Sequence, residues 1–263
     1  MLTQDIHSTD ELKMSNSLTD RRIVLTTVLA INVCLLFAES TDAAGSRRFR
    51  RSNRPVAASC CSSLPSVPPL FDGKTLDNWT TLDGKPITTG WEVVDGVIHL
   101  NKEQGRAGHI ITKHEYGDFE LSFDWKIATG GNSGVKYRVQ KYGNKTLGCE
   151  YQIYDDAGAR KLKPRNSAGS LYDLYEPNEH KQLNATGEFN STRIVVQGDR
   201  IEHWLNGKQI LAATVGSPDW DERIAASKFS EEKNFGENRF GKIMLTDHGS
   251  EVWYRKVQLR SLD

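Results

Sequence analysis

Polar side chains alternate with apolar ones along residues 149–156, a spacing that could support chemistry. Glu150, Gln152 and Tyr154 would share one face of a regular strand. A carboxylate and a carboxamide about 7 Å apart along a strand suit the binding of sugar hydroxyls and a proton transfer. Asp155 follows where the strand should end, and a small irregularity there would turn it toward the same face. A strand that ends in an acidic surface turn fits the same residues.

A second polar set follows a glycine-rich loop at residues 130–134. Its glycines and Asn132 permit a tight, exposed turn. In the alternating run that follows, Lys136 and Arg138 are expected to point away from the core on the same side. Two cations there could hold oxygen atoms of a ligand, and Asn132 is expected beside them. An ordinary solvated basic face is the alternative.

Two loop residues complete the candidate site. His248, between Asp247 and Gly249, has the side chain that titrates nearest neutral pH and is a candidate acid or base. In the alternative, Asp247 caps the backbone and His248 is merely exposed. Tyr172 could face a ligand from a flexible loop.

No cofactor is fixed by the sequence. It has no Cys/His spacing typical of zinc, no phosphate-binding glycine loop before a helix and no Gly-x-Ser-x-Gly turn. Asp155, Asp156 and Asp173 could supply oxygens to a cation, so a divalent metal remains a candidate.

Period-two alternation predicts the elements that must position these residues. Residues 119–127 place five apolar side chains on one face, and Asn206-Gly207 marks a hairpin. His203 alternates with apolar neighbours, which predicts a packed, hydrogen-bonded side chain. Residues 218–228 are the one expected helix. The pattern predicts an all-β, two-sheet antiparallel sandwich or jelly roll with one short helix.

The first seventy residues have a different composition. Arg21 and Arg22 precede an apolar run at residues 23–38, shorter than the roughly 20 residues that span a bilayer. We therefore expect residues 1–43 to be an N-terminal extension with a signal peptide, and the protein to be periplasmic or secreted. An uncleaved membrane anchor is the alternative. An Arg/Pro-rich linker at residues 44–69 would lead into a single domain at residues 70–263.

The charge balance limits the kinds of binding partner that we expect for this chain. With 34 basic and 34 acidic residues the chain has no net charge, which argues against a general attraction to nucleic acid or to an anionic membrane. No stable membrane insertion is expected once the signal is removed. The sequence leaves the oligomeric state open.

From residue 70 to 262 the chain resembles the 3-keto-disaccharide hydrolase family. Short stretches in a shared order carry the resemblance: 70–76 (LFDGKTL) with Trp79, 117–121 (GDFEL), 131–138 (GNSGVKYR), 150–153 (EYQI) with Asp155 and Asp156, 168–173 (AGSLYD), 187–194 (GEFNSTRI), 203–207 (HWLNG), and 247–249 (DHG) with Tyr254 and Arg255. The resemblance implies a concanavalin A-like fold with a sugar groove on the concave sheet. It also implies a small carbohydrate substrate.

The resemblance also bears on the reaction. Gln152 stands where related glucanases carry a second carboxylate, which speaks against a two-carboxylate retaining mechanism. The family's substrate has a ketone at carbon 3, which acidifies the hydrogen at carbon 2 and permits elimination of the aglycone. Glu150 would then act as base or acid and His248 as its proton partner. Lys136 or Arg138 would stabilise the enolate, and Gln152 and Tyr172 would hold hydroxyls. A non-catalytic, lectin-like module and a laminin-G-like interaction domain remain as alternatives.

Overall fold

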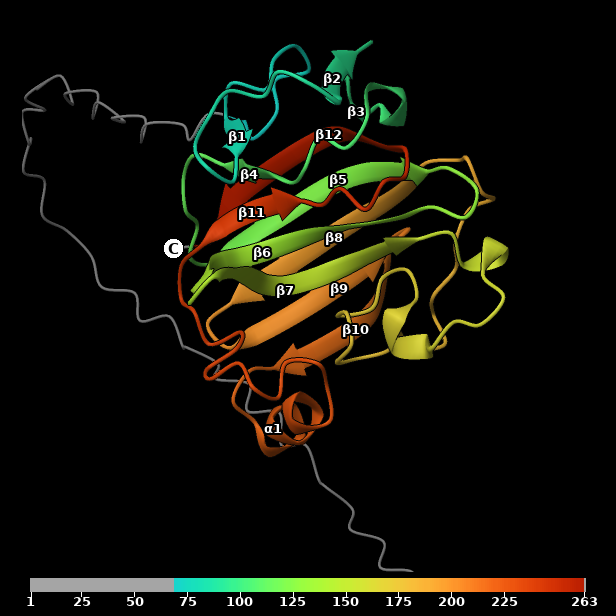
Figure 1. Cartoon of the computed structure of the whole chain (residues 1–263). Coiled ribbons are helices and arrows are strands. Elements are labelled where there is room, and N and C mark those ends of the chain that lie inside the picture. The colour runs from blue at the N-terminus through green and yellow to red at the C-terminus, as the bar shows by residue number, and fades with distance from the viewer. Residues whose placement is uncertain (1–68, 263) are drawn as a thin grey trace, which may run out of the picture. The chain divides into compact units, whose positions relative to one another are not determined.

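The computed structural model describes residues 69–262, which form two antiparallel β-sheets packed face to face (Figure 1). The expected signal peptide and nearly all of the expected linker lie outside the described residues. The five-stranded sheet has the order β1 (Trp79–Thr81), β4 (Ile110–Thr112), β11 (Lys242–Leu245), β6 (Asn132–Tyr142), β7 (Lys145–Tyr154). The seven-stranded sheet has the order β10 (Lys208–Thr214), β9 (Arg200–Leu205), β8 (Asn190–Gln197), β5 (Phe119–Ile127), β12 (Val252–Ser261), β3 (Val97–Leu100), β2 (Trp91–Val94). The predicted two-sheet sandwich is confirmed.

The core lies between the sheets and follows the period-two pattern. All five apolar residues of β5 are buried, as predicted, and they face inward-pointing side chains of β6 and β7. Each such side chain contributes roughly 1.5–3 kcal/mol to folding when fully buried. A hydrogen-bond chain crosses this core, because the Trp125 indole donates to Thr192 Oγ1 (2.9 Å), which donates to the Tyr151 hydroxyl (2.9 Å). The sheets are therefore held in register by polar contacts as well as by burial.

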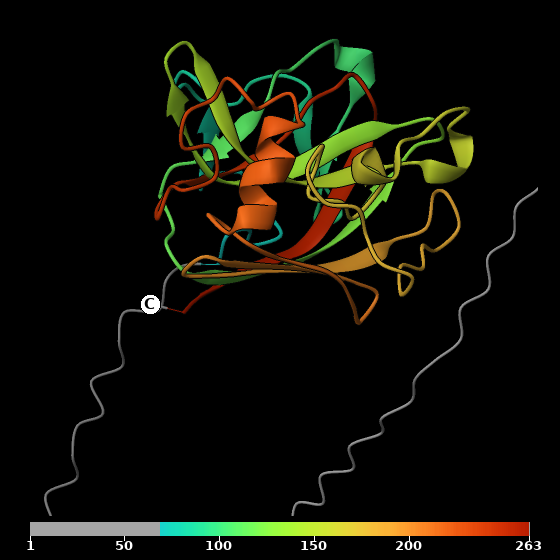
Figure 2. The same cartoon turned by 90° about the horizontal axis from the view of Figure 1, so that it is seen from below.

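The one α-helix, α1 (Pro218–Ala225), begins at the Ser217 cap, whose side chain accepts from the Trp220 backbone N–H. Trp220 is its buried residue and stacks on Tyr175. Figures 1 and 2 place α1 at the edge of the sandwich where β7 and β10 end the two sheets. The helix ends three residues before the predicted segment does, so Lys228 lies outside the helix. Three 3₁₀ turns lie in loops, at Lys102–Gln104, Asp156–Gly158 and Pro164–Asn166.

No helix within residues 69–262 is long and apolar enough to cross a membrane.

His203 links the sheets to a loop that shapes the candidate site. It is fully buried on β9, donates from Nδ1 to the Gly169 carbonyl (2.9 Å) and accepts at Nε2 from the Tyr137 hydroxyl (2.9 Å). The predicted packed, hydrogen-bonded histidine is confirmed. Burial lowers the pKa of His203 from its ordinary 6.5 to about 4.

This pKa predicts a loss of stability in mild acid. The unfolded chain takes up the His203 proton near pH 6.5, whereas the folded chain does so only near pH 4. His203 therefore contributes its full stabilisation above pH 6.5 and loses about 3 kcal/mol as the pH falls to 4. Urea unfolding at pH 7 and pH 4.5 should show a smaller pH effect in the His203→Gln variant than in the wild type. Equal pH effects in the two proteins would contradict the assignment.

Candidate functional site

The register between β6 and β7 places Lys136 directly opposite Glu150 on the outer face of the five-stranded sheet. The Lys136 ammonium lies 3.7 Å from Glu150 Oε2, and the Glu150 side chain is only 6% exposed. Its other oxygen, Oε1, is buried and finds no hydrogen-bond partner among residues 69–262. A buried carboxylate oxygen without a donor is costly unless a ligand or water meets it. Oε1 therefore has unused hydrogen-bonding capacity, which makes this carboxylate the candidate base of the site.

Gly134 lets the Glu150 carboxylate lie across β6. Gly134 pairs with Gln152, two positions along the strands from the Lys136–Glu150 pair. A Cβ added at Gly134 would overlap Glu150 Oε1. The glycine in the predicted Asn132-to-Lys136 stretch is thus needed for space beside the carboxylate.

Gln152 and Asn132 extend the same face. The Gln152 amide donates from Nε2 to Asn132 Oδ1 (2.9 Å). The Asn132 backbone N–H donates to Ser250 Oγ (3.1 Å), which ties β6 to the loop that carries His248. The predicted face of Glu150, Gln152 and Asn132 is therefore continuous, with the amide pair next to the carboxylate.

Tyr172 reaches the cluster because its loop pairs with the free edge of β7. The Tyr172 N–H donates to the Glu150 carbonyl (3.0 Å), and the Gln152 N–H donates to the Ser170 carbonyl (3.1 Å). Desolvation first, and then the negative charges of Glu150 and Asp173, raise the pKa of the Tyr172 hydroxyl. Tyr172 is therefore a neutral hydrogen-bond donor at physiological pH.

Lys228 enters the cluster from the segment after α1. Its ammonium lies 4.0 Å from the centre of the Tyr172 ring, and its backbone N–H donates to Asp173 Oδ2 (2.9 Å). Desolvation lowers the pKa of Lys228. The negative charge of Glu150 acts in the opposite direction and is the second largest influence on this pKa. The sequence analysis did not select Lys228, since it placed this residue at the end of a surface helix.

His248 and His109 form the remaining side of the cluster. Their rings meet edge to face with centroids 5.8 Å apart. His109 Nδ1 accepts from the Asp247 backbone N–H (2.9 Å), so its proton is carried on Nε2. Desolvation lowers the pKa of both rings, and the charge of Lys136 adds to that shift. Both histidines are therefore mainly neutral at pH 7.

Asp247 has the capping role that one reading of its loop predicted. Its two carboxylate oxygens accept from the Gly108 N–H (2.8 Å) and the Gly249 N–H (2.7 Å). These bonds fix the loop, while His248 is exposed and senses the charge of Glu150. Asp247 therefore caps the backbone of the loop, as the alternative predicted, and His248 also lies close enough to Glu150 to be influenced by its charge. We call Glu150, Lys136, Gln152, Asn132, Tyr172, Lys228, His109 and His248 the Glu150 cluster.

Arg138 is not in the Glu150 cluster, and its predicted orientation is wrong. The β6–β7 pairing shifts register between Tyr137 and Gln140, and Arg138 has a φ of 47°. This β-bulge breaks the alternation. The buried guanidinium donates to backbone carbonyls and to a carboxylate, at Gly117 (3.1 Å), Gly198 (2.9 Å) and Asp118 (2.7 Å). Arg138 therefore joins the two sheets instead of binding a ligand beside Lys136.

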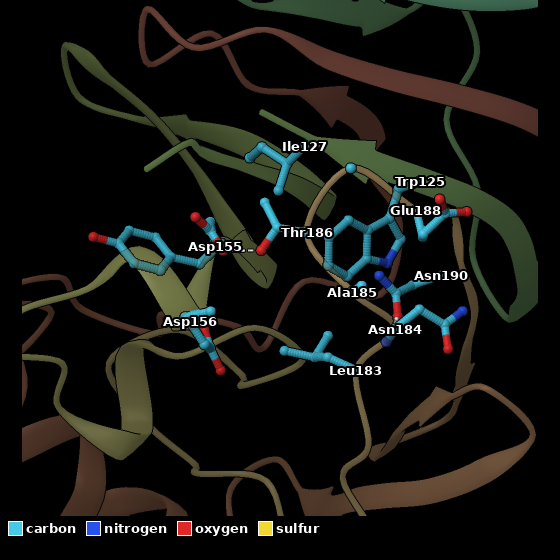
Figure 3. A pocket seen from close by; sticks show the side chains of 13 residues that line it. Trp125, Ile127, Asp155, Asp156, Leu183, Asn184, Ala185, Thr186, Glu188 and Asn190 are labelled. Carbon is cyan, nitrogen blue, oxygen red and sulfur yellow. Dashed lines mark hydrogen bonds between the residues drawn. The ribbon is translucent and has the colours of Figure 1, made fainter. Parts of the chain in front are cut away.

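Asp155 also lies apart from the Glu150 cluster. Its oxygens accept from the Gly130 N–H (2.7 Å) and the Thr186 hydroxyl (2.8 Å). Burial acts to raise the pKa of Asp155, but these hydrogen bonds outweigh it and the pKa is lowered. Asp155 lines a cavity of about 270 Å³ that also contains the Trp125 indole (Figure 3). None of the cluster residues lines that cavity.

The aspartates considered for a metal site are used elsewhere. Asp156 accepts from the Ala168 N–H and from the Lys181 ammonium, and Asp173 pairs with Arg165. Within the described part of the chain, no three His, Cys, Asp or Glu side chains are grouped so that they could hold a metal ion.

Comparisons with known proteins agree with this architecture. The sequence model of the 3-keto-α-glucoside-1,2-lyase-like domain matches residues 67–260. A protein of Bacteroides thetaiotaomicron named 3-keto-disaccharide hydrolase is 31% identical, over 84% of this chain and 91% of its own. Two crystal structures from Parabacteroides distasonis, each named as a candidate glycosyl hydrolase, are 33% and 30% identical with TM-scores of 0.65 and 0.58. Both cover 74% of this chain, and the matches span 93% and 98% of their own lengths.

Proposed function

Because this chain belongs to the family of 3-keto-α-glucoside-1,2-lyase-like domains, we propose that it cleaves the glycosidic bond of 3-keto-glycosides by elimination. The Glu150 carboxylate carries the proposal. It is buried, its Oε2 lies 3.7 Å from the Lys136 ammonium, and its Oε1 has no hydrogen-bond partner among residues 69–262. A general base needs an available lone pair held in place by its surroundings.

The reaction begins at carbon 2 of the sugar. Glu150 takes the proton from carbon 2, and the electron pair moves onto the carbonyl oxygen at carbon 3 to give an enolate. The enolate then reforms the ketone, a double bond forms between carbons 1 and 2, and the bond from carbon 1 to the aglycone oxygen breaks. Addition of water across the double bond would complete a net hydrolysis.

Other cluster residues stabilise the charges that develop. The Lys136 ammonium and the neutral Tyr172 hydroxyl supply donors for the enolate oxygen, in a partly desolvated place where such contacts are strong. His248, at the exposed side, passes a proton from solvent to the departing oxygen. Its lowered pKa makes the protonated ring a stronger acid.

A two-carboxylate mechanism fits this site less well. The retaining mechanism requires a second carboxyl about 5 Å from the first. Gln152 occupies the neighbouring position on β7, and its amide is bonded to Asn132. Asp247, in the adjacent loop, uses both oxygens on backbone N–H groups. Elimination needs only one base, so it is the mechanism that these residues favour.

Turnover of paired substrates tests the proposal. We expect the protein to cleave methyl 3-keto-α-glucoside and to leave methyl α-glucoside intact, because only the ketone acidifies carbon 2. In heavy water, the hydrated product should carry deuterium at carbon 2. Equal cleavage of the two glucosides would exclude elimination. Binding of both sugars without any cleavage would favour the lectin-like alternative.

A further inference from the structure

The outer face of the five-stranded sheet continues beyond the Glu150 cluster. Lys136 pairs with Met244 on β11, and Met244 pairs with Ile111 on β4. Directly paired residues of antiparallel strands point to the same face. The row from Glu150 through Lys136 therefore runs on to two apolar side chains on the same surface.

The bulge in β6 adds a third apolar side chain to this row. Simple alternation would turn Val139 into the core with Tyr137. Past the register shift, Val139 instead pairs with Lys242 on β11 and packs with Ile111 and Met244. These three form a small cluster that is separate from the core between the sheets. The irregularity that removes Arg138 from the Glu150 cluster thus creates an apolar floor next to it.

A hollow of about 400 Å³ opens over this floor. Its lining comes from β1 and the loop after it, from β4 and β11, and from the hairpin end of β6 and β7, and it includes Leu82, Ile111 and Val139. Leu82 forms an apolar side of the hollow and is 42% exposed. The volume suits one ring of a small ligand.

Three polar groups around the hollow are engaged with the protein itself. The Thr80 hydroxyl donates to the Lys85 carbonyl (2.7 Å), and the Gln140 amide donates to the Phe240 carbonyl (2.9 Å). The Lys242 ammonium donates to the Lys113 carbonyl (3.2 Å). A second sugar ring placed here would bury hydroxyl groups against aliphatic carbon and leave them poorly bonded. An aromatic ring carries no hydroxyl groups that would be left without hydrogen bonds.

We propose that this hollow is the aglycone subsite of the Glu150 cluster and that it selects aromatic aglycones over a second sugar. The proposal rests on the function proposed above. Lys136 and Val139 pair with Met244 and Lys242, which are two positions apart on β11. Residues spaced in this way on one strand face are about 7 Å apart, so the floor at Val139 begins about one sugar ring away from Lys136. An aglycone attached to carbon 1 of a sugar held at Glu150 can therefore lie over Val139 and against Leu82.

The test compares benzyl and methyl 3-keto-α-glucosides, whose leaving alcohols have nearly the same acidity. Any difference in kcat/KM then reports contact with the aglycone and not the quality of the leaving group. We expect wild-type kcat/KM to be about 10-fold higher for the benzyl substrate. Leu82→Ser should remove most of that advantage and leave the methyl substrate unchanged, and Leu82→Met should keep it.

Val94→Ser is the matched control, because Val94 is an aliphatic residue of similar exposure (47%) at the end of β2, in the other sheet. It should leave both substrates unchanged. Equal kcat/KM for benzyl and methyl substrates in the wild type, or an equal loss for both in Leu82→Ser, would overturn the subsite.

A binding experiment separates this inference from the proposed function. Calorimetry with the unoxidised benzyl and methyl α-glucosides needs no turnover. Tighter binding of the benzyl compound that depends on Leu82 would support the hollow as a subsite even if no 3-keto-glucoside is cleaved. Cleavage of 3-keto-glucosides without any benzyl preference in rate or binding would leave the function intact and refute the subsite.

Discussion

Replacing Glu150 with Gln is expected to lower kcat for methyl 3-keto-α-glucoside by about 10²–10⁴-fold, the range typical of losing a general base. The amide has nearly the same shape as the carboxylate and cannot take the proton from carbon 2. Lys136 loses an ion-pair partner at 3.7 Å, but it is not fully buried and can turn toward solvent. KM should therefore change far less than kcat.

The matched control for this substitution is Glu120→Gln. Glu120 lies on the outer face of the seven-stranded sheet, where it pairs with Arg193 and Arg260. Surface pairs of this kind contribute little to stability, so the control should keep full activity. Steady-state kinetics of the two variants, with near-ultraviolet dichroism to verify folding, completes the experiment. A Glu150→Gln protein with wild-type kcat would remove Glu150 from the role of base.

Much of the fold and part of the candidate site follow from the sequence because alternation is a local property. In β7 the alternate residues Cys149, Tyr151 and Ile153 join the core, as period two predicts, so Glu150 and Gln152 lie on the outer face. The hairpin at Asn206 forms because this residue accepts a positive φ of 47°. Such features depend only on neighbours in the chain.

Arg138 shows how local reasoning fails. One extra residue in β6 reverses the face of every later position, and no turn residue or proline announces the change. The cause is long-range, since the guanidinium is held by Gly117 and Asp118, just before β5, and by Gly198 from the β8–β9 turn. A sequence read strand by strand cannot include contacts that exist only once the two sheets pack.

His109 and Lys228 could not be selected for a related reason. His109 precedes β4, and it meets His248 because β4 lies next to β11, a neighbour relation that strand order along the chain does not reveal. Lys228 reaches Tyr172 because α1 ends at Ala225 and the chain turns back onto the sheet. Alternation could have indicated His109, since Ile110 faces the core and its neighbour must face outward.

Replacing Gly134 with Ala is expected to lower the activity of this protein strongly while changing its stability little. The added methyl group would overlap Glu150 Oε1, and the carboxylate lies at the far end of a flexible side chain that can move away. The free energy of unfolding should therefore change by no more than about 1 kcal/mol, since alanine also restricts the unfolded chain. Displacing a catalytic group by about 1 Å is expected to lower kcat about 10²-fold.

Gly241→Ala provides the contrast, because it adds the same methyl group against atoms that cannot yield. There the new Cβ would overlap the backbone of Arg138, inside the bulge. We expect this variant to lose about 2 kcal/mol or more of stability and to keep its activity per folded molecule. Urea unfolding and kcat measured on both proteins would give opposite patterns. If Gly134→Ala kept full kcat, the position of the Glu150 carboxylate over β6 would not matter for the reaction, and the base would have to be sought among the other residues of the Glu150 cluster.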